Sequence, residues 1–100
     1  MDDVRFEWDP RKAETNWRKH GVRFEIAAHI FEDPNIFDVE EGNDHGEIRF
    51  RAIGEAFGRL FFVSFTAFEE DGQDVIRIIS ARKASKAEYR AYQRHTQDHR

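Results

Sequence analysis

The alternation of apolar and polar positions predicts a short strand followed by a helix at the N-terminus. Residues 4–8 alternate with the two-residue period of a β-strand. Asp9 and Pro10 then mark a helix start, because aspartate caps free backbone N–H groups and proline tolerates the first helical position. We expect this helix to run to about Lys19 and to end at Gly21, which suits a left-handed residue.

A second helix is predicted directly after the first, so that the two form a hairpin. Its apolar residues recur at the spacing of one helical face, and they are Phe24, Ala27, Ala28 and Phe31. Asp33 and Pro34 end the pattern. Arg23 stands where a small polar capping residue is typical, so the start of this helix is weakly marked.

The remainder of the chain has the pattern of an antiparallel meander with a final helix. The predicted strands are residues 36–40, 47–53, 59–68 and 74–81, with turns at 42–46 and 69–72. Glu47, Arg49 and Arg51 should share one face of their strand. Ser85 and Glu88 form a capping box for a helix that runs to about His95. We therefore expect one α+β domain over residues 1–100, with a small antiparallel sheet, an N-terminal helical hairpin and a C-terminal helix.

Composition limits the possible chemistry. Ten phenylalanines among 100 residues predict an aromatic core, and the absence of cysteine excludes disulfides, thiolate metal sites and a cysteine nucleophile. The sequence has no apolar run of the roughly 18–20 residues that a membrane helix needs. Because it opens on Met1, Asp2 and Asp3, which is unlike a basic signal peptide, we expect a cytoplasmic protein.

Charge is unevenly distributed along the chain. Residues 32–47 contain seven acidic side chains and no lysine or arginine, whereas residues 75–100 contain seven basic and two acidic side chains. A basic C-terminal quarter can meet a polyanion locally although the net charge is −4. The same pattern is also typical of an ordinary solvated helix, so charge alone leaves both interpretations open.

Arg77 is the most informative candidate for function. It interrupts an apolar run, Val75 to Ile79, that otherwise has the pattern of a buried strand. A guanidinium in that position needs a carboxylate, a phosphate or water, so either a structural ion pair or an anion site is expected. Arg82 and Lys83 follow near the start of the last helix, which favours anions. In a regular strand Arg77 and Arg82 face opposite sides, so a bulge near Ser80 is needed to bring them together.

Other candidates have ordinary structural alternatives. Lys19 and His20 offer a cation and a group that titrates near neutral pH, although a histidine at a helix end also stabilises the helix dipole. Arg49 and Arg51 either bind an anion or pair with acids on a solvated face. Tyr89 and Tyr92 lie three residues apart on one helical face, where core packing is the simpler role and base stacking the other.

Known cofactor motifs are absent from the sequence. It contains no Walker loop, Gly-rich dinucleotide loop, calcium-loop pattern or Gly-x-Ser-x-Gly elbow, and we expect no metal and no cofactor. Cleavage of RNA needs only a base for the 2′-hydroxyl, cations for the charge that develops on phosphorus, and an acid for the leaving 5′-oxygen. The candidate side chains above can supply these groups.

Several segments resemble the BrnT toxins of type II toxin–antitoxin systems. These segments are Phe6-Glu7-Trp8-Asp9-Pro10 with Lys12, Asn16, Lys19-His20-Gly21-Val22, Phe24-Glu25, Phe31 with Asp33-Pro34, Glu47-Ile48-Arg49-Phe50, Ile53-Gly54, and residues 76–84. The resemblance implies a RelE-like fold and a metal-independent endoribonuclease that arrests growth. It also implies a BrnA-like ribbon-helix-helix antitoxin that neutralises the toxin, with operator DNA bound only through the autorepressing complex.

By position, the resemblance extends to Lys19, His20, Arg49, Arg77, Arg82 and Lys83, and we expect the first five to be catalytic. The RNA contacts are expected from Lys83 and, by their place on a strand face and a helix face, from Arg51 and Tyr92. We expect Arg77 and Arg82 to stabilise phosphate charge and Lys19 or His20 to transfer protons. The alternative is a catalytically inactive toxin-like module that acts mainly within a repressor complex.

Overall fold

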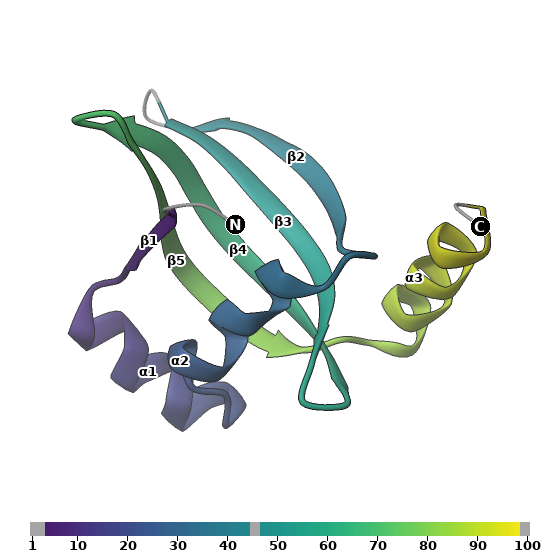
Figure 1. Cartoon of the computed structure of the whole chain (residues 1–100). Coiled ribbons are helices and arrows are strands. Elements are labelled where there is room, and N and C mark those ends of the chain that lie inside the picture. The colour runs from purple at the N-terminus through teal and green to yellow at the C-terminus, as the bar shows by residue number, and fades with distance from the viewer. Residues whose placement is uncertain (1–3, 45–46, 99–100) are drawn as a thin grey trace.

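The chain folds into a five-stranded sheet with helices on one face and at one end (Figure 1). The computed structural model describes residues 4–44 and 47–98. In chain order the elements are β1 (Val4–Glu7), α1 (Pro10–His20), α2 (Phe24–Ala27), the 3-10 helix η1 (Ala28–Glu32), β2 (Phe37–Asp44), β3 (Glu47–Ala56), β4 (Arg59–Glu70), β5 (Gln73–Lys83) and α3 (Lys86–Asp98). The predicted α+β class is therefore confirmed.

The sheet is mixed, with strand order β1-β5-β4-β3-β2. Strands β2 to β5 form the predicted antiparallel meander, and β4 is central. Strand β1 joins the edge of β5 in parallel. The helices that follow β1 carry the chain across one face of the sheet (Figure 1). Such a crossover is what a parallel neighbour requires.

Both ends of α1 form as the sequence predicted. Asp9 accepts a hydrogen bond from the Arg11 backbone N–H at 2.8 Å. Gly21 adopts φ 67° and its N–H donates to the Trp17 carbonyl at 2.9 Å. The second predicted helix is only partly right, because just the four residues of α2 are α-helical and the chain continues as η1. Arg23 makes no side-chain cap at its start, as expected.

The predicted turn at residues 42–46 is wrong in its first part. Strand β2 continues through Gly42 to Asp44, with a register shift between Glu40 and Gly42 opposite β3. A bulge absorbs the irregular backbone there without ending the pairing. Residues 45 and 46 lie outside the described residues. Strands β3, β4 and β5 are longer than predicted, since cross-strand pairing continues beyond the apolar runs. Strand β1 ends at Glu7, one residue earlier than predicted.

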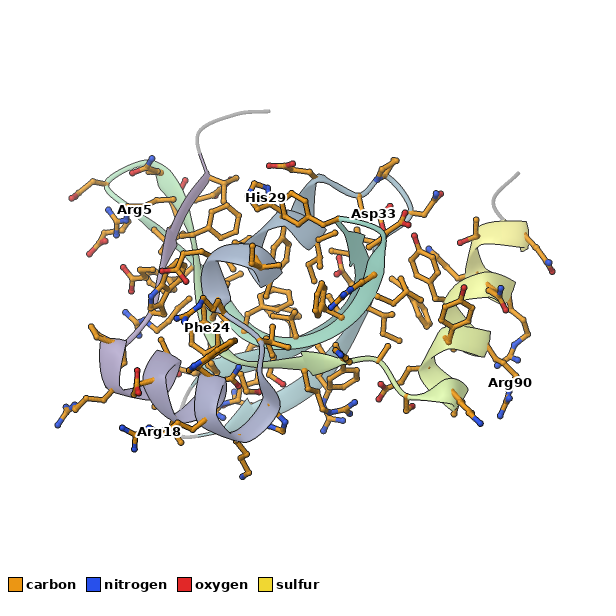
Figure 2. The ribbon with its side chains drawn as sticks, turned by 90° about the horizontal axis from the view of Figure 1, so that it is seen from below. Arg5, Arg18, Phe24, His29, Asp33 and Arg90 are labelled. Atoms are coloured by element: carbon orange, nitrogen blue, oxygen red, sulfur yellow. The ribbon has the colours of Figure 1, made fainter. Side chains whose placement is uncertain are left out.

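The core lies between the sheet and the layer formed by α1, α2 and η1. Phe24 points from α2 into this space (Figure 2) and is fully buried. Of the largest fully buried side chains, Phe24, Ile30, Ile78 and Val63 belong to this core. Val75 is also fully buried, but it is on the side of β5 that carries Arg77. Gly54 lies so close to η1 that a Cβ atom there would stand 2.7 Å from the Ile30 Cβ. The absence of a side chain at this position lets η1 approach β3 closely.

The side chain of Asn16 connects α1 to the edge of β5 by hydrogen bonds. Its side-chain amide donates to the Ala81 carbonyl at 2.9 Å, while its Oδ1 accepts from the Ala81 N–H at 3.0 Å. Nδ2 also donates to the Val22 carbonyl at 3.0 Å. Since β1 pairs with β5 only as far as Arg77, Asn16 replaces the missing strand neighbour of Ala81. This contact positions α1 beside the segment that carries Ser80 and Arg82.

Helix α3 stands beyond one end of the sheet (Figure 1). The predicted capping box is present, with Ser85 N–H to Glu88 Oε1 at 2.8 Å and Glu88 N–H to Ser85 Oγ at 3.1 Å. The helix extends three residues past the predicted end at His95. Core packing was the simpler of the two roles expected for Tyr89 and Tyr92. Tyr89 is 50% exposed and is therefore not a core residue.

Candidate functional site

Four arginines share the sheet face opposite the core. Arg49 pairs with Thr66, which pairs with Arg77, in one row across β3, β4 and β5. In the same way Arg51 lies in the row of Ser64 and Ser80. Arg82 pairs with Phe62 one row further along. Cross-strand partners project to the same side of a sheet, so we call this surface, defined by Arg49, Arg51, Arg77 and Arg82, the arginine face.

A bulge in β5 creates this arrangement. Ser64 pairs with Ser80, but the next residue of β4, Phe65, pairs with Ile78, so Ile79 is an extra residue. The inserted residue restores a common orientation for Arg77 and Arg82, which strict alternation would separate. The predicted condition for a shared site, a bulge near Ser80, is therefore met.

Arg77 is exposed although β5 is buried at Val75 and Ile78, as the pattern predicted. Of the expected partners for its guanidinium, the structure shows carboxylates. The Arg77 side chain is 45% exposed because its side of β5 is not covered by the helical layer. Arg77 Nε donates to Glu7 Oε2 at 2.7 Å, and Arg77 Nη1 lies 3.8 Å from Glu47 Oε2. The guanidinium also lies over the Phe68 ring at 5.1 Å. The hydrogen bond from Arg77 holds the pKa of Glu7 below its usual value, so this carboxylate is ionised at neutral pH.

Arg82 is tied to α3 by a bidentate ion pair. Its Nη1 and Nη2 atoms donate to the two carboxylate oxygens of Glu88, each at 2.9 Å. Burial acts to raise the pKa of Glu88, but hydrogen bonds from Arg82 and the Ser85 backbone outweigh it and lower that pKa. Arg82 is thus both a candidate anion ligand and part of the anchor of α3. Lys83 pairs with Phe61 and therefore projects away from the arginine face.

Aromatic and hydroxyl groups lie between the arginines. The Phe62 ring has the Arg82 guanidinium at 4.2 Å and the Arg51 guanidinium at 5.6 Å from its centroid. Thr66, between Arg49 and Arg77, is 3% exposed, and its hydroxyl has no hydrogen-bond partner among the described residues. A buried hydroxyl normally has one.

Lys19 and His20 lie beside the arginine face rather than on it. Both line a pocket of about 290 Å³ between α1 and the bulge of β5, together with Ile79 and Ser80. Ser80 also belongs to the arginine face, so the two sets of side chains meet at the bulge. The histidine ring is exposed at the end of α1, where a substrate can reach it.

Lys12 lies at the site, although the sequence analysis did not name it as a candidate site residue. It lines the pocket of Lys19 and His20, and also an adjoining pocket of about 380 Å³ that contains Glu7 and Arg77. Its spacing was the available signal, because residues seven apart on a helix, such as Lys12 and Lys19, share one face. The cationic surface therefore continues from the end of α1 to Arg77.

Tyr92 belongs to a different part of the molecule. Its hydroxyl donates to Asp33 Oδ2 at 2.7 Å. Burial and this carboxylate raise the pKa of Tyr92 well above the ordinary tyrosine value. Tyr92 and Lys83 line a groove of about 540 Å³ between α3 and the turn that joins β3 to β4. The structure thus separates these two predicted RNA contacts from the arginines.

Two further properties concern only the part of the chain that the structure describes. Within residues 4–44 and 47–98, no three His, Asp or Glu side chains are grouped so that they could hold a metal ion. The helices in these ranges include none that is long and apolar enough to cross a bilayer.

A compact α+β fold with clustered guanidinium, lysine and imidazole groups beside hydroxyls has the chemistry to bind a phosphodiester and to act on it. Residues 8–88 match the family model described as the ribonuclease toxin BrnT of type II toxin–antitoxin systems. The chain therefore belongs to the BrnT family, and the resemblance found in its motifs is confirmed. No curated protein matches the chain.

Proposed function

We propose that this protein is an endoribonuclease toxin that binds its RNA across the arginine face and cleaves it at the Ile79 bulge without a metal ion. The observation that carries the proposal is the bulge itself, which places Arg77, Ser80 and Arg82 on one face with Arg49 and Arg51. Family membership supports the ribonuclease activity. The cation density supports binding of a phosphate backbone.

In the proposed reaction the 2′-oxygen of the substrate loses its proton to a base and attacks the adjacent phosphorus. The bond from phosphorus to the 5′-oxygen then breaks, and an acid protonates that oxygen, leaving a cyclic 2′,3′-phosphate and a 5′-hydroxyl. Arg77, with Arg49 and Arg51, stabilises the charge on the phosphoryl oxygens. Lys19 or His20 transfers the proton from the pocket beside Ser80.

A phosphate has to compete with acids that already hold the cations. Arg77 is engaged by Glu7 and Glu47, and Arg82 by Glu88. Arg77 is nevertheless half exposed, and an exposed ion pair contributes little stability, so a phosphate that replaces Glu7 meets a small opposing free energy. The Glu7 carboxylate then faces the bound backbone as an anion. This exchange predicts a strong dependence of RNA binding on salt concentration.

The proposal is tested by cleavage of a defined RNA with purified, antitoxin-free protein in EDTA. Parent protein should cleave and Arg77→Ala should lose about a hundredfold in rate, the order of magnitude attributed to one preorganised charge donor. Arg18→Ala is the matched control, since it removes the same charge from an exposed position whose side chain points outward from α1 (Figure 2). Equal cleavage by the parent and Arg77→Ala contradicts the assignment of the site.

A second candidate function is an inactive toxin-like module in an antitoxin repressor complex. The observation in its favour is that both Arg77 and Arg82 are paired with carboxylates within the chain. Expression without the antitoxin separates the two functions, because only an active toxin stops growth. If folded protein fails to cleave free RNA but cleaves it when ribosomes are added, the toxin function holds with ribosome dependence. No cleavage in either case favours the inactive module.

We further propose that the partner is a BrnA-like ribbon-helix-helix antitoxin, which neutralises the toxin and joins it in a complex that represses their operon. Support comes from the type II toxin–antitoxin description of the family. Mobility-shift assays on operator DNA provide the test. A shift is expected with the antitoxin complex and not with this chain alone, whose net charge of −4 disfavours duplex DNA.

A further inference from the structure

The turn between β3 and β4 displays an apolar ring that the fold does not bury. Phe57 is 69% exposed, more than any other large apolar side chain that the structure describes. Its ring makes an edge contact with the His29 ring, with 5.1 Å between centroids. Ile26, one helical turn before His29, is also 38% exposed. A ring this exposed contributes little to the core.

The backbone at Phe57 shows that the ring is kept at a cost to the fold. Phe57 and Gly58 have φ values of 53° and 78°, and Asp71 and Gly72, in the turn between β4 and β5, have 53° and 79°. A two-residue hairpin turn with both φ values positive favours Asn, Asp or Gly at its first position and strains a bulky residue. One of two matching turns in this chain has the favoured residue, and the other has phenylalanine. Turn geometry therefore gives no reason for Phe57.

The surface next to Phe57 is acidic. A pocket of about 370 Å³ adjoins the ring and is lined by His29, Glu32, Asp33, Pro34, Glu55, Ala56 and Phe57. Asp33 is used within the fold, where it accepts hydrogen bonds from Tyr92 and from the Glu55 backbone N–H. The carboxylate of Glu32 is 71% exposed and has its Oε2 atom 3.1 Å from His29 Nδ1, and Glu55 is exposed as well. An exposed ring beside exposed carboxylates complements a partner with an apolar side chain next to a cation.

Arg59, the nearest cation along the hairpin, lines the groove beside α3, which Glu55 also borders, and is not among the residues of this pocket.

We infer that Phe57, Glu32 and Glu55 form a docking site for the neutralising antitoxin, and specifically for a segment in which a lysine or arginine flanks an apolar side chain. The inference rests on the proposed function for the identity of the partner. The apolar side chain packs on the Phe57 ring, and the cation enters the pocket between the two carboxylates. The Phe57 ring stands at the end of the hairpin, four residues or about 13 Å along the strand from the row of Ile53, Phe62 and Arg82. The ring is thus apart from the arginines, whereas Glu55 lies two residues from that row.

The first test is titration of purified Phe57→Asn protein with its cognate antitoxin. Asparagine suits the turn, so the variant should melt at a temperature equal to or above that of the parent. Its Kd for the antitoxin should rise about tenfold or more, as expected for a central aromatic contact. Asp71→Asn is the matched control, with the same new residue at the same position of the other turn, and should bind like the parent. Unchanged affinity of folded Phe57→Asn overturns the inference.

A second arm tests the charges. Glu32→Gln with Glu55→Gln removes both exposed carboxylates while leaving the Glu55 backbone hydrogen bond to Asp33 in place. We expect weaker antitoxin binding at low salt and a shallower dependence of Kd on salt. Parent-like affinity and salt dependence contradict a cationic partner segment. Sedimentation of the free protein identifies the rival occupant, because self-association that Phe57→Asn abolishes would assign the surface to a second copy of this chain.

Growth and cleavage assays test the docking site separately from the proposed ribonuclease activity. Phe57→Asn should still cleave RNA and arrest growth, but co-expressed antitoxin should no longer protect the cells fully. If the parent is not toxic, the ribonuclease proposal fails, while the titration still decides whether the antitoxin docks at Phe57. If Phe57→Asn loses RNA cleavage along with antitoxin binding, the ring is part of the RNA site and the inference is wrong.

Discussion

Replacement of Asn16 by alanine should destabilise the fold more than its small change in volume suggests. The variant loses three hydrogen bonds and leaves the Ala81 N–H and the Ala81 and Val22 carbonyls without their partner. Ala81 is 1% and Val22 4% exposed, so water does not readily replace the amide. At about 1 kcal/mol or more for each buried unsatisfied group, the loss is about 3 kcal/mol. This is a large part of the 5–15 kcal/mol that is typical of a whole domain.

Asn16→Asp separates the hydrogen-bond argument from the effect of a cavity. Aspartate has the same shape and still accepts from the Ala81 N–H, but when ionised it faces two carbonyl oxygens without a proton to donate. Burial raises the pKa of the introduced carboxyl in the folded state. Its cost is therefore small below the unfolded pKa of about 3.9, increases as pH rises toward the folded pKa, and is constant above it.

The assay is urea unfolding followed by tryptophan fluorescence, because Trp8 packs against the buried Phe24 ring. Parent, Asn16→Ala and Asn16→Asp are compared at pH 7 and near pH 4. The aspartate variant should approach the parent at the lower pH, whereas the deficit of the alanine variant should change little. A loss below about 1 kcal/mol for Asn16→Ala, or a pH-independent deficit for Asn16→Asp, would refute the reasoning.

Three further predictions concern packing and titration. Gly54→Ala should lower the free energy of unfolding by about 1–3 kcal/mol, because its Cβ would meet the Ile30 Cβ at 2.7 Å; urea unfolding measures this, and an unchanged midpoint contradicts it. The pKa of Glu7 should rise toward its ordinary value in Arg77→Ala, since Arg77 lowers it; NMR titration measures the shift, and the parent's extra stability from this pair should be lost as pH falls through the lowered pKa. Tyr92→Phe should increase hydrogen exchange in α3 while the sheet is unaffected, because the bond to the η1 end is lost; equal protection in both proteins argues against this anchor.

The stability that comes from the pKa shift of Tyr92 depends on pH in the opposite direction to that from Glu7. Burial and a neighbouring carboxylate raise its folded pKa, so the neutral phenol is favoured in the native state. The corresponding stability is present below the unfolded pKa of about 10 and declines as pH rises above it. We therefore expect the contact of α3 with Asp33 to weaken as the pH rises above about 10.

Local signals in the sequence were sufficient for both ends of α1, for the start of α3 and for much of the sheet. Asp9, Gly21 and the Ser85–Glu88 box act within four residues of the backbone groups that they satisfy, so their effect can be predicted without the fold. The faces of the strands could also be predicted, because the pleat of a strand places alternate residues such as Arg49 and Arg51 on one side. The second helix was less certain, since Arg23 supplies no cap.

The candidate site was only partly predictable. The types of side chain were evident, and the resemblance to the BrnT toxins selected six basic side chains, which are Lys19, His20, Arg49, Arg77, Arg82 and Lys83. Their grouping was not evident, because it depends on which strands are neighbours. Tyr92 and Lys83 proved to line a separate groove, while Lys12 and Glu7 adjoin Arg77 through contacts between β1, α1 and β5.

The sequence by itself determined the α+β class, the caps of α1 and α3, the faces of β3 and the family. Tertiary structure decided that β1 lies parallel to β5, that Ile79 bulges so that Arg77 and Arg82 share a face, and that Arg77 is exposed and paired with Glu7. The physical reason is the range of the interactions. Caps and alternation act over a few residues, whereas Glu7 and Arg77 are 70 residues apart and meet only when the sheet forms.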